Sequence, residues 1–166
     1  MRDVWIRDEL PGDHEPVRRL LLDCFPGPQE AGLVAQLRDD GDAVVGLVAT
    51  AGAAGVVGHV MLSVMQAPFR ALALAPVAVA APWRRQGIAT RLIDAAIGRA
   101  GREGWQAIFV LGNPDFYGRF GFTVEMAAGF ASPYAGPWLM ARALPSGRLP
   151  TMAGPITHAR ALASLG

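Results

Sequence analysis

The sequence contains no lysine, so all 15 basic residues are arginines, and 14 acidic residues nearly balance them to a formal net charge of +1. A protein that binds nucleic acid over a broad surface normally carries a clear basic excess. The balance therefore argues against a general nucleic-acid-binding protein. A local basic patch formed by Arg18, Arg19 and Arg38 leaves a more restricted contact open.

Cysteine is almost absent. Cys24 stands alone, which excludes an internal disulfide and a cysteine-rich metal site. It falls on the apolar face of a predicted helix, where we expect a core residue. His14, His59 and His158 lie far apart in the sequence and lack the spacing of metal ligands. We therefore predict no metal site.

Long hydrophobic runs are also missing, although 52% of the residues are hydrophobic and the mean hydropathy is +0.28. The longest run, residues 71–83, contains Pro76 and Pro82 and is shorter than the roughly 20 residues of a membrane-spanning helix. The first residues, MRDVWIRDEL, carry charges throughout and offer no apolar segment for a secretory signal. We therefore expect a cytoplasmic protein without a membrane partner.

The chain has 166 residues, of which 17% are charged, as expected for a folded domain and not for a disordered chain. We predict a single domain over residues 1–166. Residues 145–166 form a C-terminal tail whose proline- and glycine-punctuated sequence shows only weak periodicity.

Hydrophobic periodicity predicts the element order β-α-α-β-β-β-α-β-α-β-β. A crossover between residues 71–80 and 105–112 would make those two strands parallel, and hairpins would make the remaining strands antiparallel. The predicted fold class is therefore mixed α/β (α+β), with a mostly antiparallel central sheet of about seven strands and helices on both faces. Asp13 is the predicted N-cap of the first helix. Strands are expected at 4–10, 43–50, 55–64, 71–80, 105–112, 121–127 and 137–144, and helices at 14–25, 29–38, 87–104 and within 113–120.

The segment PWRRQGIATRL, residues 82–92, lies between a predicted buried strand and a predicted helix. A helix start collects unpaired backbone N–H groups and the positive end of the helix dipole. Gly87 permits any φ and a close approach of the backbone to a ligand, and Ala89 keeps the next position small. This pattern favours a pyrophosphate cradle over an ordinary loop. It matches neither a P-loop, which needs GKS/T, nor a G-x-G-x-x-G fingerprint.

Two motifs resemble the GNAT superfamily of acyl-CoA-dependent N-acetyltransferases. The family signature Q/R-x-x-G-x-G/A is matched by Arg84, Gly87 and Ala89, and the second motif, Y-x-x-x-G-F, is matched by Tyr117, Gly121 and Phe122. The segments VLGNPDFYGRFGF (110–122) and CFPGPQEAGLVAQLR (24–38) are similar to the YhbS-type subgroup. The resemblance spans residues 4–144. It implies the GNAT fold and transfer of an acetyl group from acetyl-CoA to an amine by direct attack in a ternary complex.

The resemblance also implies roles for individual residues. A bulged strand before the loop would pair with the pantetheine arm, the loop would bind the pyrophosphate, and a family asparagine would contact the pantetheine. Tyr117 would protonate the departing CoA thiolate; the alternative is a packing tyrosine. The alternative for Asn113 is a helix cap, and the alternative for the two arginines is a solvated face. The cofactor-binding residues implied are Val77, Ala78, Val79, Arg84, Arg85, Gln86, Gly87, Ile88, Ala89, Thr90 and Asn113.

The general base is not evident, because the central strand ALALAPVAVA carries no acid. Glu30, Glu125 and His59 are the nearest candidates in the sequence. We favour deprotonation of the amine through ordered water, with the backbone N–H of Val79 stabilising the oxyanion.

Two other functions remain open. One is a non-catalytic GNAT-fold module that binds CoA or regulates a partner, and the other is an acetyltransferase acting on charged tRNA, which the net charge disfavours. The expected partners are acetyl-CoA and a small-molecule or peptide amine. A homodimer would cover the antiparallel sheet edge expected near the C-terminus.

Overall fold

The computed structural model describes residues 3–144 and 148–164. The main sheet consists of β1 (Trp5–Asp8), β2 (Ala43–Thr50), β3 (Val56–Met65), β4 (Ala71–Val79), β5 (Ala107–Leu111) and β7 (Leu139–Ala143). Within the described residues these six strands lie in the order β1-β2-β3-β4-β5-β7. All neighbours are antiparallel except β4 and β5, which are parallel. The predicted mixed, mostly antiparallel sheet is confirmed, with six strands in place of about seven.

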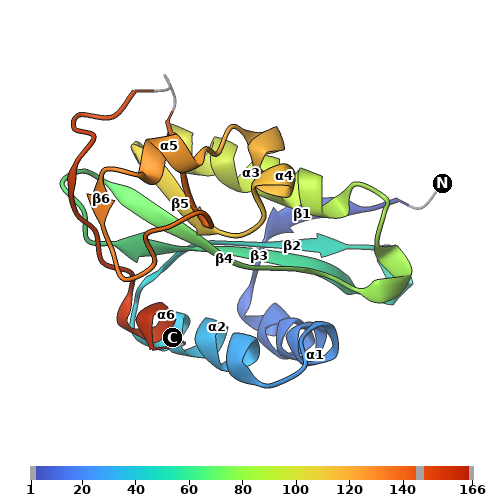
Figure 1. Ribbon diagram of the computed structural model, residues 1–166. Helices are drawn as coiled ribbons and strands as arrows, with labels where there is room; N and C mark the ends of the chain where they lie inside the picture. Colours follow the sequence, from blue (N-terminus) through green and yellow to red (C-terminus); the bar gives the residue numbers. More distant parts are fainter. Residues whose placement is uncertain (1–2, 145–147, 165–166) are drawn as a thin grey trace.

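Helices cover both faces of the sheet, as predicted (Figure 1). One face carries α3 (Ile88–Arg102), α4 (Pro114–Tyr117) and α5 (Val124–Ala127), and the other carries α1 (His14–Cys24), α2 (Gln29–Asp39) and α6 (Arg160–Ala163). Short 3-10 turns are η1 (Pro11–Asp13), η2 (Gly52–Ala54), η3 (Ala81–Trp83) and η4 (Gly118–Phe120). No helix in residues 3–144 and 148–164 is long and apolar enough to cross a membrane.

The core has a part on each side of the sheet. On one side the apolar stripe of α3, including Leu92, Ile93 and Ala96, is fully buried against β2, β3 and β4. On the other side Leu21 of α1 and Leu37 of α2 pack over the same strands. Complete burial of a leucine or isoleucine side chain stabilises a fold by about 1.5–3 kcal/mol. This packing fixes α1 and α3 relative to β4.

The prediction of a strand at residues 121–127 is wrong. Only Thr123 makes a bridge, to Ala141, and the chain then turns into α5. The hydroxyl of Thr123 accepts a hydrogen bond from the backbone N–H of Met126 at 3.1 Å, which is an N-cap contact. The capping threonine and the following Glu125, Met126 and Ala127 favour a helical turn over an extended strand.

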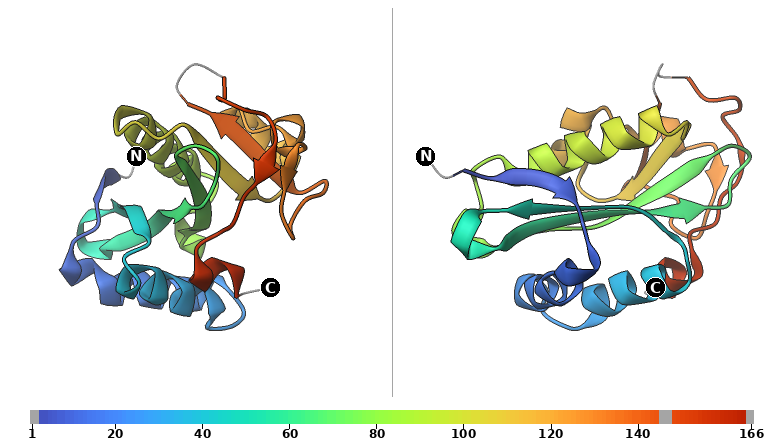
Figure 2. Two further views of the ribbon diagram at one scale, coloured as in Figure 1. Left: turned by 90° about the vertical axis from the view of Figure 1, so that its left-hand side faces the viewer. Right: turned by 180° about the vertical axis from the view of Figure 1, so that it is seen from behind.

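The C-terminal segment, weakly patterned in sequence, is held by backbone pairing. Strand β8 (Gly154–Pro155) pairs in parallel with β6 (Phe130–Ala131), and Thr157 bridges Gln66 at the end of β3. The segment then passes to α6, which packs on α2. Figure 2 shows this path, in red, running from the β6 side of the molecule to the face that carries α1 and α2.

Strand β4 is irregular where it approaches the loop that follows it. Opposite β3, Val60 pairs with Val77 and Leu62 pairs with Leu74, so β4 uses one residue more than β3 over this interval. Such an extra residue is a β-bulge, which bends the strand and leaves backbone groups unpaired. The parallel pairing with β5 ends at the pair Ala73–Phe109, although both strands continue. Strands β4 and β5 therefore separate beyond this point.

Candidate active site

The loop between β4 and α3 has the backbone of an anion site. Arg85 and Gly87 both have left-handed conformations, with φ of 63° and 78°. Gly87 is the N-cap of α3, so the first N–H groups of this helix lack intrahelical acceptors. Alternating right- and left-handed residues turn successive N–H groups toward one point and form an anion-binding concavity. The helix dipole adds positive potential there.

Arg84 holds this loop against the strand before it. Its Nε donates to the carbonyl oxygen of Val79 at 2.8 Å, and Gln86 Nε2 donates to the carbonyl oxygen of Pro82 at 3.3 Å. The Arg84 guanidinium is thus anchored at the end of β4, whereas the Arg85 side chain makes no hydrogen bond or ion pair with the other described residues.

A cavity of about 230 Å³ opens over the loop. Arg119 of η4 also lines this cavity and was not identified from the sequence. The guanidinium of Arg119 stacks on the Phe116 ring at 4.6 Å, and its Nε donates to the Phe116 carbonyl oxygen at 3.3 Å. The only signal for Arg119 in the sequence was its position two residues after Tyr117. The cavity is lined by Val79, Trp83, Arg84, Arg85, Gly87, Ile88, Ala89, Thr90, Phe116 and Arg119.

Four of the predicted cofactor residues lie outside the lining of this cavity. Val77 and Ala78 pair with Val60 and His59 of β3, on the part of β4 that has separated from β5. Gln86 lies in the loop itself. Asn113 caps α4, because its side-chain oxygen accepts a hydrogen bond from the Asp115 N–H at 2.9 Å.

Tyr117 lies at the end of α4, close to the end of β5. Its ring packs edge-on against Phe116 and Phe122, with centroid distances of 4.9 and 6.0 Å. Burial raises the pKa of the Tyr117 phenol above its usual value. The phenol therefore keeps its proton at neutral pH and can act as a hydrogen-bond donor and proton donor.

A second cavity, of about 400 Å³, lies where β4 and β5 separate. Its walls are mostly apolar, but Glu30 of α2, Tyr134 and His158 also line it. Glu30 was one of the three candidates for the base. Helix α2 and the C-terminal segment lie on the face of the sheet opposite to α3 and α4 (Figure 1). The two cavities are therefore approached from opposite faces. The remaining lining residues are Ala73, Leu74, Ala75, Phe109, Val110, Leu111 and Leu162.

Neither His59 nor Glu125 lines either of these two cavities. His59 is fully buried in β3, and its Nε2 lies 2.7 Å from Glu9 Oε1. Glu9 also accepts a hydrogen bond from Arg38 Nε at 2.8 Å. Glu125 is exposed on α5. His59 therefore belongs to a buried polar cluster under α1 and α2.

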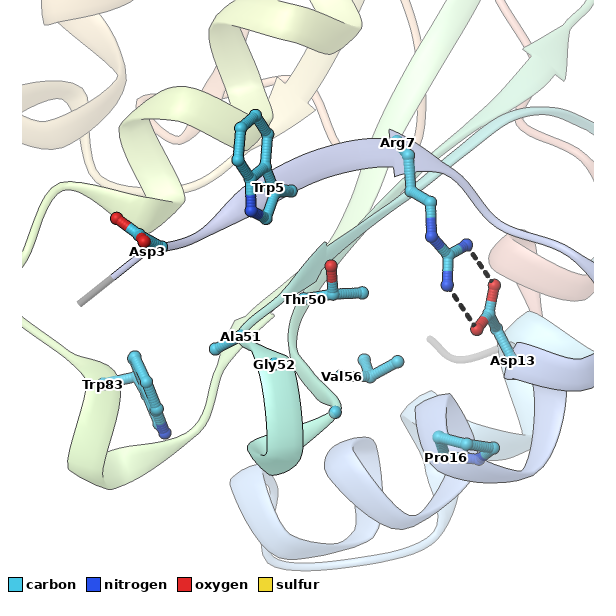
Figure 3. Close-up of a pocket in the computed structure, with 11 residues that line it drawn as sticks. Asp3, Trp5, Arg7, Asp13, Pro16, Thr50, Ala51, Gly52, Val56 and Trp83 are labelled. Carbon is cyan, nitrogen blue, oxygen red and sulfur yellow. Dashed lines mark hydrogen bonds and ion pairs between the residues drawn. The ribbon is translucent and has the colours of Figure 1, made fainter.

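A larger cavity, of about 760 Å³, lies beside β1 and the β2–β3 connection (Figure 3). Arg7 and Asp13 face each other there, with contacts of 2.6 and 3.0 Å, so their charges compensate. Asp13 occupies the N-cap position as predicted, but its carboxylate accepts from the Leu10 N–H at 2.7 Å and does not cap α1. Trp83 borders both this cavity and the loop cavity.

Strands β4 and β5 separate before a left-handed loop at the start of α3, and the half-buried Tyr117 lies near the end of β5. The model of the acetyltransferase (GNAT) family matches residues 14–122. The uncharacterised N-acetyltransferase YhbS of Escherichia coli K12 is 38% identical over 126 residues, which are 74% of each chain. The chain therefore belongs to the GNAT family of N-acetyltransferases, and the resemblance seen in the sequence is confirmed.

Solved structures agree with this assignment. The E. coli YhbS structure in complex with CoA has a TM-score of 0.93 and 29% identity, and the match covers 100% of this chain and 95% of that one. A GNAT acetyltransferase from Brucella melitensis in complex with acetyl-CoA has a TM-score of 0.81 and 23% identity, with coverage of 98% and 99%. The second likeness is one of fold.

Proposed function

We propose that this protein transfers an acetyl group from acetyl-CoA to a primary amine by direct attack within a ternary complex. The observation that carries the proposal is the left-handed loop at Arg85 and Gly87, which opens onto a cavity beside the separated strands β4 and β5. Structures of similar proteins hold CoA or acetyl-CoA.

In this proposal the pyrophosphate lies on the backbone N–H groups of residues 85–90. Arg85 and Arg119, which both line the cavity, add charge-assisted contacts to its oxygens. Arg84 shapes the loop through its bond to Val79. Two positive charges in the cavity lining suit a dianionic group better than a neutral one.

The pantetheine arm then follows β4 past the bulge. Residues 77–79 no longer have β5 as a neighbour, so their backbone groups on that side are available to an extended ligand. The N–H of Val79 remains our candidate for the oxyanion contact, and Asn113 lies next to this path at the end of β5.

The acceptor approaches from the opposite face, through the cavity that Glu30 lines. Its apolar walls and single carboxylate suit an amine with an apolar substituent. The amine nitrogen forms a bond with the acetyl carbonyl carbon, and the C–S bond then breaks with its electron pair leaving on sulfur. The attacking nitrogen loses one proton through ordered water, and Tyr117 donates the proton that converts the thiolate to CoA-SH.

Calorimetric titration with acetyl-CoA tests the proposal, using wild type and Gly87→Glu. The added carboxylate repels phosphate and obstructs the loop, so we expect micromolar binding by wild type and none by the variant. Gly104→Glu is the matched control, since Gly104 has a similar φ of 84° and open space around it. Absence of binding by folded wild-type protein would refute the acetyl-CoA assignment and favour a non-catalytic module.

A further inference from the structure

His158 is a buried side chain that forms no hydrogen bond or ion pair with the other described residues. Backbone pairing of the two preceding residues fixes its position, because Thr157 N donates to the Gln66 carbonyl oxygen at 2.8 Å and Ile156 N donates to the Ala131 carbonyl oxygen at 3.0 Å. His158 is only 7% exposed and lines the cavity between the separated strands. The C-terminal segment thus places the His158 imidazole in the wall of the proposed acceptor cavity.

The imidazole has no hydrogen-bond partner among the described residues. Its neighbour Tyr134 meets it edge to face, with ring centroids 5.1 Å apart, and the Tyr134 hydroxyl instead donates to the Ala163 carbonyl oxygen at 3.1 Å. The ring nitrogens are not among the fully enclosed side-chain atoms of the described residues, so a ligand in the cavity can reach them. Burial also lowers the pKa of His158 below its usual value, so the ring is neutral at pH 7 and can accept a proton.

The charged and titratable groups around His158 lie in two cavities. In the cavity between the strands they are Glu30 of α2 and Tyr134. His158 also lines an outer cavity of about 610 Å³, which includes Asp42 and Arg160. Arg160 is paired with Asp40 at 3.1 Å, so part of its charge is compensated. The Glu30 carboxylate attracts an ammonium ion into the cavity between the strands. The outer cavity gives a proton released from His158 a path away from that site.

We propose that His158 is the base that removes a proton from the ammonium form of the acceptor, with Glu30 binding that ammonium group first. The assignment rests on the proposed function. An ammonium ion has three N–H protons and the amide product retains one. His158 takes the first, which frees the lone pair that attacks the acetyl carbon. The second leaves the nitrogen after attack and passes through ordered water to Tyr117, which has given its own proton to the thiolate; the products are therefore the amide, CoA-SH and one proton held by His158. Tyr117 is then reprotonated, and His158 releases its proton toward the outer cavity.

The test compares wild type, His158→Gln and His158→Ala with phenethylamine as the acceptor probe. Release of the CoA thiol is followed from pH 5 to 9, and acetyl-CoA binding is measured separately by calorimetry. Loss of a general base typically lowers the rate about 10²- to 10⁴-fold. We expect kcat/KM to fall at least 100-fold in His158→Gln, with acetyl-CoA affinity unchanged.

The pH profile separates catalysis from packing. Wild-type kcat/KM should fall as the pH drops through the lowered pKa of His158, and this acidic limb should vanish in His158→Gln. Added imidazole should restore part of the rate to His158→Ala, because that variant leaves space for it. His14→Gln is the matched control, since His14 lies on α1 outside this cavity, and it should behave as wild type.

Retention of the acidic limb and of the rate within threefold in His158→Gln would overturn the assignment. So would wild-type protein that binds acetyl-CoA but releases thiol no faster than His158→Gln. Failure of wild type to bind acetyl-CoA would instead refute the proposed function itself, and calorimetry distinguishes these results. If His158→Gln does not fold, imidazole rescue of His158→Ala decides the question.

Discussion

The ring of Tyr117 occupies the space that a Cβ atom on Gly112 would need, because a Cβ there would collide with Cε2 and Cδ2 of the ring. Glycine at the end of β5 therefore sets how close the tyrosine lies to the strand. Since the proposed proton donor is held by this contact, its position can be changed without altering the phenol.

Gly112→Ala should push the Tyr117 ring out of place and lower kcat about 10- to 100-fold, because proton transfer is sensitive to displacements of about 1 Å. Acetyl-CoA affinity should change little. Gly118→Ala is the matched control, since a Cβ at Gly118 meets nothing within 4 Å, and it should keep wild-type kcat. An unchanged kcat in a folded Gly112→Ala protein would mean that the tyrosine position is not critical. Steady-state kinetics and thermal unfolding provide both measurements.

Tyr117→Phe removes the proton donor and keeps the ring that packs on Phe116 and Phe122. We expect kcat to fall about 100-fold or more, with the melting temperature and acetyl-CoA affinity close to wild type. Because burial raises the pKa of the phenol, wild-type activity should persist to a pH above the usual range of a tyrosine before its basic limb. A variant with wild-type kcat would assign Tyr117 to packing alone.

Arg119→Ala should weaken acetyl-CoA binding about tenfold, because one charge-assisted contact to phosphate is lost from a partly solvated cavity. The effect should shrink as salt concentration rises. Arg70→Ala is the matched control, since Arg70 also stacks on an aromatic ring, that of Trp105 at 4.4 Å, but lies away from the cavity. Calorimetry at two salt concentrations tests this, and equal losses in both variants would contradict a phosphate contact.

Gly46 in β2 provides the space for the buried carboxylate of Glu9, since a Cβ on Gly46 would overlap it. Gly46→Ala should therefore disrupt the contacts of Glu9 with His59 and Arg38 and lower the free energy of unfolding by about 1–3 kcal/mol. Gly32→Ala on the exposed side of α2, where a Cβ has open space, should instead be neutral or stabilising. Denaturant unfolding of both variants decides whether the Glu9 cluster matters.

Glu9 should also make stability depend on pH. Burial alone would raise its pKa, but hydrogen bonds from His59 and Arg38 outweigh burial and lower it. Ionised Glu9 thus stabilises the fold above the pKa of an unfolded glutamate, about 4.3, and this contribution is lost as the pH falls through the lower folded value. Glu9→Gln should be less stable than wild type at pH 7, and the difference should shrink toward pH 3. A difference independent of pH would contradict this account.

Most strands and helices could be predicted because their signals lie in residues that are close together in the sequence. The helix predicted at 87–104 and the strand predicted at 71–80 agree with α3 and β4 to within a few residues. The one or two helical turns predicted within 113–120 agree equally well with α4 and η4. The prediction failed at 121–127, where Thr123 caps a helical turn although the residues resemble the apolar–polar alternation of a strand. Asp13 was correctly predicted at the N-cap position of α1, but its carboxylate accepts hydrogen bonds from Arg7 and the Leu10 N–H and does not cap the helix.

By itself the sequence determined the mixed fold and the glycine loop before α3, because helix starts, turns and buried strands depend on neighbouring residues. It also carried the motifs by which the family was recognised. Only the tertiary structure decided which side chains face the separated strands. Arg119 reaches the loop cavity through the packing of η4, and His158 reaches the acceptor cavity through the pairing of the C-terminal segment with Gln66 and Ala131. These contacts join residues far apart along the chain, and no local periodicity encodes such a distance.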